Sequence, residues 1–356
     1  MVSPYLKNKG SAVRFCLWPQ GFYSFFLKAV TKTVTNIIYM KKVLLTGASG
    51  FLGGAISNKI INSGKFELHA IVRDKKKVCR FNLENFSKKS YVYNVDLVDF
   101  NQTYELIKRV KPDYIIHTAA LVNVNEAVRA PITAFENSAI SYLNILESIR
   151  LNKINTKIIN HSSDKVYNNN IPPYVELMDL KPKHIYDVGK VTQEYLGNSY
   201  YFHYGVKTVN IRSGNYYGHY DFDFNRLIPY ICKCIVQNKE IILRASKNFS
   251  RDFLYIEEAA SVNLKFLEMF ELNNFDSFGE SFNFSQEKAY SIESIIKNFE
   301  ILENKSLNVV YENNQMFESK ELLLDCNKSK KVLTWKNSTD FEKGLKQTLE
   351  FYKNYF

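Results

Sequence analysis

Two side chains near the middle of the chain have the types and spacing of an acid–base pair. Tyr186 and Lys190 are four residues apart, so on a helix they lie on the same face. A tyrosine with an ordinary pKa near ~10 is a poor base at neutral pH, but a neighbouring ammonium group stabilises the phenolate and lowers that pKa. This pair could therefore take a proton from a substrate hydroxyl group.

A second group of polar residues follows a short apolar run that predicts a strand. Ser163, Asp164 and Lys165 place a hydroxyl, a carboxylate and an amine near the carboxyl end of that strand, where ligands bind in parallel α/β sheets. Two plainer interpretations stay open. Asp164 and Lys165 could form a structural ion pair, and Tyr186 with Lys190 could be an ordinary surface pair.

Glycines near the start of the chain indicate what these groups act with. An apolar strand over residues 43–46 runs into a turn with Gly47, Gly50 and Gly53, and a helix follows. The first glycine allows the tight turn, the second lets phosphate oxygens approach the backbone, and the third allows close packing of helix on strand. The helix N-terminus adds partial positive charge. Together with the tyrosine–lysine pair, this pattern predicts hydride transfer with a nicotinamide dinucleotide.

The residues after the second predicted strand bear on the choice of dinucleotide. Arg73 and Asp74 stand where an acidic residue binds the ribose diol of NAD, or an arginine accommodates the extra phosphate of NADP. Both types are present. Arg73 comes first and lysines at 75–77 add positive charge, although these lysines could equally form a solvated turn. The pattern slightly favours NADP over NAD.

Length and composition indicate an ordinary globular protein with a mildly basic surface. The 356 residues are 46% hydrophobic and 15% aromatic, enough to bury a full core. The net charge is +11, but five of the 47 basic residues lie in the acid-free residues 1–40, which leaves 42 basic against 36 acidic residues. No basic block with interleaved aromatics predicts nucleic-acid binding.

The cysteines predict neither a disulfide framework nor a metal site. They are odd in number, widely scattered and without a CxxC pair, which fits a reducing cytoplasm. They stand at Cys16, Cys79, Cys232, Cys234 and Cys326.

The first forty residues are interpreted as an extension outside the fold. Met40 with two following lysines resembles a natural chain start. The basic composition could also serve a membrane surface, but no long charge-free apolar span predicts stable membrane insertion.

From residue 41 onward, short apolar strands alternate with helical patterns. This alternation predicts an α/β fold, a Rossmann-type doubly wound parallel sheet with helices on both faces. We expect strands at 43–46, 68–72, 91–95, 114–117, 157–160 and 208–211, and helices at 51–62, 104–108, 132–150 and 186–202. The dinucleotide-binding domain is expected over 41–212, and a smaller substrate-binding lobe mainly over 213–356.

The order of these motifs resembles the extended short-chain dehydrogenase/reductases, the NAD(P)-dependent nucleotide-sugar epimerases and dehydratases. The likeness covers about residues 41–355. Its marks are TGASGFLGG from Thr46, Asp96, the run HTAA from His117, Asn137, Ser163, Tyr186 with Lys190, RSGNYYG from Arg212 and RDFLYI from Arg251.

The resemblance implies roles for particular residues and a homodimer formed through the helices at 132–150 and 186–202. Ser163, Tyr186 and Lys190 are the implied catalytic triad, with Asp164 and Lys165 beside them. The implied dinucleotide contacts are Gly47, Ser49, Gly50, Phe51, Leu52, Gly53, Arg73, Asp74, Asp96, Leu97, Thr118, Ala119, Ala120, Asn137, Tyr186 and Lys190, and the implied substrate contacts are Asn215, Arg226 and Arg251.

Within this family, three runs look like CDP-glucose 4,6-dehydratase: SSDKVY at 162–167, NRLIP at 225–229, and LDCNK at 324–328 followed by Trp335. The chain departs from the family at Gly189, where serine is usual, and at Ile185, where proline is expected. Residues 172–186 look closer to the dTDP-4-dehydrorhamnose reductases.

The leading hypothesis is a cytoplasmic nucleotide-hexose 4,6-dehydratase. A 4-epimerase or a 4-keto-sugar reductase would share the chemistry at C4 but lack the elimination. A non-catalytic dinucleotide-binding scaffold or sensor is the rival from another class, although such proteins commonly lose the tyrosine or the lysine.

Overall fold

The computed structural model describes residues 40–120, 124–168, 170–273, 275–312 and 320–356. The chain groups into two compact units, Met1–Met40 and Lys41–Phe356, and the second unit is described here. Apart from Met40, the expected N-terminal extension and Cys16 lie outside the described residues.

Seven parallel strands form the central sheet in the order β10-β6-β5-β4-β1-β2-β3. The central strands are buried along most of their length because helices cover both faces. The order reverses between β1 and β4, which is where ligands bind in such sheets. The strands are β1 (Lys41–Thr46), β2 (Phe66–Ile71), β3 (Tyr91–Tyr93), β4 (Tyr114–His117), β5 (Lys157–His161), β6 (Lys207–Ser213) and β10 (Ser281–Phe284). The predicted doubly wound sheet is present.

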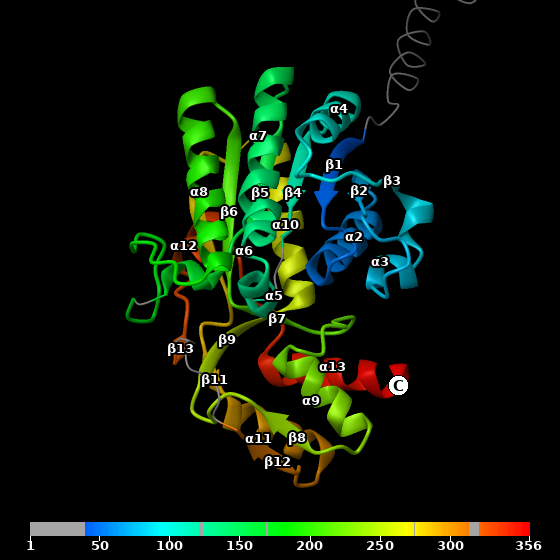
Figure 1. The fold of residues 1–356 in the computed structure, drawn as a ribbon, viewed down its shortest axis with the longest axis vertical. Helices are drawn as coiled ribbons and strands as arrows, with labels where there is room; N and C mark the ends of the chain where they lie inside the picture. Colours follow the sequence, from blue (N-terminus) through cyan, green and yellow to red (C-terminus); the bar gives the residue numbers. More distant parts are fainter. Residues whose placement is uncertain (1–39, 121–123, 169, 274, 313–319) are drawn as a thin grey trace, which may run out of the picture. The chain divides into compact units, whose positions relative to one another are not determined.

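Helices cover both faces of this sheet (Figure 1). α2 (Phe51–Ser63) packs with α10 (Ile256–Glu271), whereas α4 (Phe100–Val110), α7 (Ser141–Asn152) and α8 (Ile185–Tyr204) pack together on the other face. The shorter helical segments are α3 (Arg80–Leu83), η1 (Phe86–Lys89), α5 (Val124–Arg129), α6 (Pro131–Phe135), η2 (Glu136–Ile140), η3 (Asp164–Tyr167) and α12 (Asn327–Leu333).

The helix expected over 132–150 is divided into three segments. Pro131 opens α6 at a position where its missing N–H costs nothing. A π-helical turn, η2, then shifts the backbone register before α7 begins. Hydrophobic spacing alone does not reveal this turn, because the backbone is helical on both sides of it.

A smaller lobe follows β6 and has its own core. One sheet contains β7 (Asn215–Tyr217), β9 (Ser250–Tyr255), β11 (Ala289–Ser291) and β13 (Glu321–Leu322), and a second pairs β8 (Ile241–Leu243) with β12 (Val309–Tyr311). The helices are α9 (Leu227–Val236), α11 (Ile292–Glu303) and α13 (Phe341–Tyr355). Tyr217, Ile231 and Phe341 are buried at the centre of this lobe.

The boundary expected between residues 212 and 213 does not divide the fold cleanly. α10 packs on α2, and β10 pairs with β6 at the edge of the central sheet. Phe266 and Phe282 pack edge to face within the main core. Parts of the second lobe are therefore separated along the chain by elements that belong to the main core. The four-residue run of β10 is too short for pattern alone to assign it to the central sheet.

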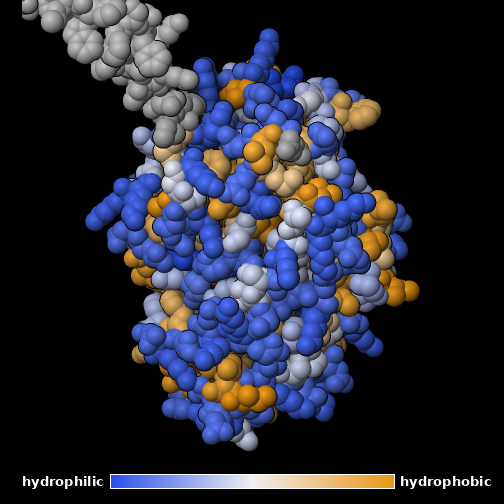
Figure 2. All heavy atoms as spheres, turned by 180° about the vertical axis from the view of Figure 1, so that it is seen from behind, coloured by the Kyte–Doolittle hydropathy of each residue, from blue (hydrophilic) through white to orange (hydrophobic). Residues whose placement is uncertain are grey.

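On the face opposite that of Figure 1, the hydrophobic residues among those that the structure describes are scattered. Figure 2 shows small hydrophobic groups there, separated by hydrophilic residues. Within the described residues, no helix has the length and apolar character needed to cross a membrane. The four described cysteines, Cys79, Cys232, Cys234 and Cys326, are buried and free.

Candidate active site

A cavity of about 1370 Å³ lies beyond the carboxyl ends of β1, β4, β5 and β6 and reaches into the second lobe. Every residue predicted for catalysis or substrate binding lines it, and so does every predicted dinucleotide contact except Asp74. The structure thus brings together in one cavity residues that are spread over two hundred positions of sequence.

The turn between β1 and α2 leaves room for a phosphate group. Gly47 has a φ of 68°, and a Cβ on Gly53 would lie 2.1 Å from the Gly47 carbonyl oxygen. The α2 N-terminus has neither a side-chain cap nor an acidic residue in its first turn. Its N–H groups and partial positive charge suit an anion. These residues therefore fit a dinucleotide diphosphate.

Thr46 joins this turn to the end of β4. Its Oγ1 accepts hydrogen bonds from the N–H groups of Thr118 and Ala119, both at 3.1 Å. Its own proton is then available to His117 Nδ1 at 3.0 Å. Burial lowers the pKa of His117 well below its ordinary value, so the ring is neutral. Thr46 is not among the residues predicted from sequence, although its position directly before Gly47 indicates that it lies beside the dinucleotide turn.

Of the two residues weighed for dinucleotide choice, Arg73 faces the cavity and Asp74 does not. Arg73 Nη1 donates to Asn137 Oδ1 at 2.9 Å across the cavity. The Asp74 carboxylate instead accepts the backbone N–H of Lys76 at 2.8 Å and caps the turn. Asp96 stands after β3 and also accepts a local backbone N–H, that of Val98 at 3.1 Å.

α8 brings Tyr186 and Lys190 to the cavity wall. Lys190 is buried and donates to the His161 carbonyl oxygen at 2.6 Å, and burial lowers its pKa to about 8. Burial raises the pKa of Tyr186, and the charges of Asp187 and Asp164 raise it further, whereas a hydrogen bond with Ser163 lowers it. The pKa of Tyr186 is therefore raised in this structure, contrary to the expected lowering by Lys190.

Ser163 and Asp164 form a connected pair at the start of η3. Ser163 Oγ caps η3 by accepting the Lys165 N–H at 3.2 Å and donates to Asp164 Oδ1 at 3.1 Å. Burial raises the pKa of Asp164 to about 6, although the charge of Lys165 opposes this. Asp164 Oδ2 and Ser162 Oγ are buried without a hydrogen-bond partner in the described chain. Such orphaned atoms beside a cavity suit a polar ligand.

The three predicted substrate contacts differ in how they are held. Asn215 opens β7 on the cavity wall. Arg226 is held by Asp221 at 2.7 Å and by the Tyr216 carbonyl oxygen at 2.5 Å, and it lies over the Phe51 ring. Arg251 Nη1 donates to the Ser250 carbonyl oxygen at 2.8 Å. Arg226 thus links the second lobe to the dinucleotide turn.

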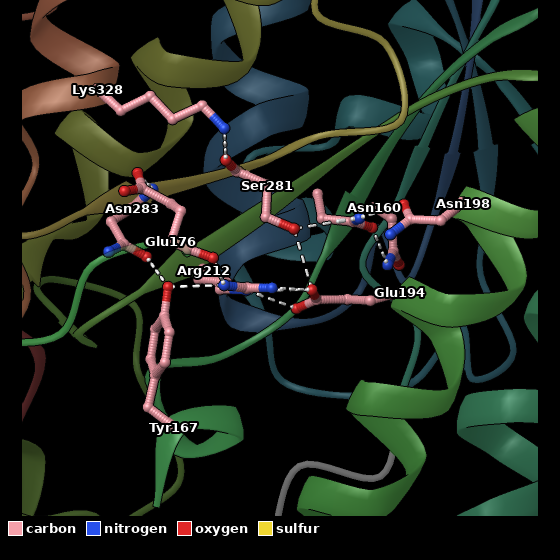
Figure 3. A network of polar contacts seen from close by, with 10 residues as sticks. Asn160, Tyr167, Glu176, Glu194, Asn198, Arg212, Ser281, Asn283 and Lys328 are labelled. Carbon is pink, nitrogen blue, oxygen red and sulfur yellow. Dashed lines mark hydrogen bonds and ion pairs between the residues drawn. The ribbon is translucent and has the colours of Figure 1, made fainter. Parts of the chain in front are cut away.

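A buried polar network anchors α8 behind the cavity (Figure 3). Glu194, one turn beyond Lys190, pairs with Arg212 of β6 at 2.5 Å, and both side chains are nearly inaccessible. Arg212 also donates to Tyr167 Oη at 2.7 Å, and Ser281 Oγ of β10 donates to Glu194 at 3.0 Å. The sequence analysis cited Arg212 as a family mark but missed this network, because its members are distant in sequence.

Comparison with known proteins settles the family. The family model for GDP-mannose 4,6 dehydratase matches residues 44–348. The chain belongs to this family. The protein is therefore an enzyme of the NAD-dependent nucleotide-sugar dehydratase/epimerase type, and the resemblance to extended short-chain dehydrogenase/reductases is confirmed.

The relatives share the whole fold at low sequence identity. A dTDP-glucose 4,6-dehydratase of Shigella flexneri is 24% identical over 343 residues, covering 87% of this chain and 92% of the relative. The structure of a UDP-glucose 4-epimerase from Thermotoga maritima with UDP-glucose is 22% identical with a TM-score of 0.80, covering 88% of this chain and 99% of that one.

A third comparison bears on the cofactor. The structure of a dTDP-glucose 4,6-dehydratase from Bacillus anthracis in complex with NAD is 19% identical with a TM-score of 0.76, covering 88% of this chain and 97% of that one. This relative holds NAD, so it lends no support to the expected preference for NADP.

Proposed function

We propose that this family member is a nucleotide-hexose 4,6-dehydratase. The observation that carries the proposal is the placing of Asp164 and Lys165 beside Ser163 and Tyr186 in one cavity, with the Asp164 pKa raised to about 6 by burial. A carboxyl group whose pKa is raised toward neutral pH can act as a general acid. Oxidation at C4 alone would not require a general acid.

The dinucleotide would lie along the β1–α2 turn and reach Tyr186 and Lys190. When bound in its oxidised form, it supplies a hydride acceptor for C4 of the sugar and later returns the hydride at C6. Tyr186 takes the proton of the 4-hydroxyl group, and Ser163 hydrogen-bonds the same oxygen. Lys190 would hold Tyr186 in the ionised form that can accept this proton, and would bind the ribose of the dinucleotide.

Elimination of water then requires a second acid–base pair. A ketone at C4 acidifies the proton on C5, and Lys165 is the proposed base that removes that proton. Asp164 donates its proton to the 6-hydroxyl group, which leaves as water. Lys165 returns its proton to C5 as the hydride is added to C6, and the proton held by Tyr186 replaces the one lost by Asp164. The products then balance as one 4-keto-6-deoxy sugar and one water, with no net change of the dinucleotide.

Incubation with candidate substrates tests the proposal. Purified protein is given CDP-, dTDP-, GDP- and UDP-hexoses with NAD or NADP, and sugar mass and nicotinamide absorbance are followed together. Loss of one water without net cofactor turnover supports the dehydratase and names the base. A new isomer of unchanged mass identifies an epimerase instead, and stoichiometric use of NADPH on a 4-keto sugar identifies a reductase. The CDP-hexose is the first to test, because the chain resembles CDP-glucose 4,6-dehydratase at residues 162–167.

For the dinucleotide, we propose that Arg73 contacts the adenosine ribose or its phosphate. Arg73 faces the cavity and Asp74 does not, which favours NADP, whereas the related dehydratase structure contains NAD. Titration with both dinucleotides decides between them. If NADP is preferred, Arg73→Ala should remove the preference, and if NAD is preferred, the same change should alter NAD binding only slightly.

A further inference from the structure

A row of hydrogen bonds runs from the cavity wall to α10. Tyr216 and His161 both line the cavity, and Tyr216 Oη lies 3.2 Å from His161 Nδ1. His161 Nε2 lies 2.8 Å from Asn263 Oδ1, and Asn263 Nδ2 donates to the Ala259 carbonyl oxygen at 2.9 Å. These contacts join β7, β5 and α10, and neither His161 nor Tyr216 has a role in the chemistry proposed above.

The far end of the row fixes the direction of every proton in it. Because the Asn263 amide nitrogen is bound to a carbonyl oxygen, its oxygen faces His161 and must accept. His161 therefore carries its proton on Nε2, which leaves a lone pair on Nδ1. Burial lowers the pKa of His161 to about 4, so the ring holds one proton only. The phenol of Tyr216 must then donate to Nδ1.

The direction of this bond determines what Tyr216 offers to a ligand. Its proton is directed at His161, so its oxygen can only accept hydrogen bonds from a ligand. Tyr216 lines the same cavity as Tyr186 and Asp164. Burial raises the pKa of Tyr216, and the charge of Asp164 raises it further. Ser213 hydrogen-bonds Tyr216 and leaves the second lone pair of the phenol oxygen for a further donor.

We propose that Tyr216 is a specificity-determining residue that accepts a hydrogen bond from one hydroxyl group of the hexose. His161 is the positioning residue that keeps the phenol proton turned away from the sugar. This inference rests on the proposed function, since it takes a nucleotide-hexose as the ligand. A site built in this way rejects an analogue that cannot donate, because the buried oxygen loses its partner.

Binding of fluorinated sugars tests the proposal directly. The probe is whichever of CDP-glucose, dTDP-glucose, UDP-glucose and GDP-mannose binds the dinucleotide-loaded wild-type protein most tightly. Its deoxyfluoro analogues, one for each hydroxyl position, accept but do not donate hydrogen bonds. We expect one analogue to bind wild type roughly 10-fold or more weakly than the parent sugar, and Tyr216→Phe to reduce that difference to about 2-fold. Equal discrimination in wild type and Tyr216→Phe would overturn the proposal.

Variants of His161 separate positioning from packing. His161→Leu removes the acceptor and lets the phenol proton turn toward the sugar, so the same analogue should bind better relative to the parent. His161→Gln can accept through its side-chain oxygen and should restore part of the discrimination. Loss of binding to all sugars alike in both variants would indicate a purely structural role for His161 and contradict the assignment.

The predicted position of the proton on the His161 ring can be tested without a substrate. Nitrogen NMR of protein labelled in its histidines reports which ring nitrogen is protonated, and His161→Leu assigns the signal. We expect protonation on Nε2 and a changed Nδ1 signal in Tyr216→Phe. Protonation on Nδ1 would overturn the inference and leave the proposed function untouched, whereas absence of binding to all four sugars would overturn the proposed function and with it the assignment of Tyr216.

Discussion

At the scale of single residues, burial determines the properties of the cavity wall. It lowers the pKa of Lys190 to about 8 and raises that of Asp164 to about 6, so each residue is shifted toward its neutral form. Ionisable groups with perturbed pKa values cluster at functional sites, which supports a catalytic role for both residues. The effect on Asp164 can be measured both in turnover and in stability.

Replacing Asp164 should separate the two halves of the proposed reaction. Asp164→Asn keeps the shape of the side chain but removes the acid, so water loss should slow by roughly 10²- to 10⁴-fold. Reduced nicotinamide should still form, because oxidation at C4 does not use this group. Absorbance and sugar mass followed together report the two steps. Asp276→Asn, at an exposed carboxylate, is the matched control. Equal loss of both steps in Asp164→Asn would contradict the assignment.

The raised pKa of Asp164 also predicts how stability depends on pH. The folded state holds this proton more tightly than the unfolded state, so stability falls as pH rises from about 4 to about 6. The loss is on the order of 3 kcal/mol for this one group. Asp164→Asn should therefore be more stable than wild type at pH 7.5, with little gain at pH 4. Urea unfolding at both values measures this, and a difference that does not change with pH would contradict it.

At the scale of elements, the β1–α2 turn and the anchoring of α8 position the site. The turn requires the backbone at Gly53 to lie close to the backbone at Gly47, whereas α8 is fixed by the buried ion pair of Glu194 with Arg212. Each therefore responds to a different kind of substitution.

A methyl group at Gly53 should disrupt the dinucleotide turn. Its Cβ would lie 2.1 Å from the Gly47 carbonyl oxygen, so α2 must move away from β1. We expect Gly53→Ala to lower dinucleotide affinity at least ~10-fold, because the backbone N–H groups at the α2 N-terminus would no longer point at the diphosphate. Equilibrium titration measures this. Asn62→Ala, at the exposed end of the same helix, should bind as wild type does. Unchanged affinity in Gly53→Ala would show that the turn tolerates the shift.

The Glu194–Arg212 pair should matter more than a surface pair on a neighbouring helix. Glu194→Gln leaves the Arg212 charge buried without compensation, which costs roughly 3–5 kcal/mol when a buried pair is broken. Glu147→Gln breaks the more exposed pair with Arg150 of α7 and should change stability little. Chemical denaturation compares the two variants. Equal effects would mean that burial does not set the contribution of the Glu194–Arg212 pair.

At the scale of the whole molecule, exposed apolar side chains on α7 and α8 fit the expected homodimer. Tyr195 and Phe202 are seven residues apart on α8 and are 58% and 83% exposed, and Leu151 of α7 is 45% exposed. We predict that wild type is a dimer and that Tyr195→Asp with Phe202→Asp makes it a monomer. Light scattering after gel filtration measures the mass. Leu272→Asp, exposed on the opposite face, is the control and should remain dimeric. A monomeric wild-type protein would contradict the predicted homodimer.

Local patterns predicted the parts of the fold that depend on neighbouring residues. The strand before Gly47, the turn and the spacing of Tyr186 and Lys190 are all contained in short stretches, so the Rossmann-type sheet and the candidate residues followed from them. The pairing of β10 with β6, the Glu194–Arg212 network and the bond between His161 and Tyr216 join residues far apart in sequence. A single sequence carries no local signal for such contacts.

The return of the chain to the central sheet has a consequence for synthesis. A ribosome delivers β6 long before β10, and residues 214–280 must emerge in between. During that interval the last strand of the growing sheet presents unpaired backbone groups, which are open to pairing with other nascent chains. Contacts of such sequence separation also form slowly. Residues 214–280, which line much of the cavity, therefore determine how long the nascent chain needs protection from aggregation.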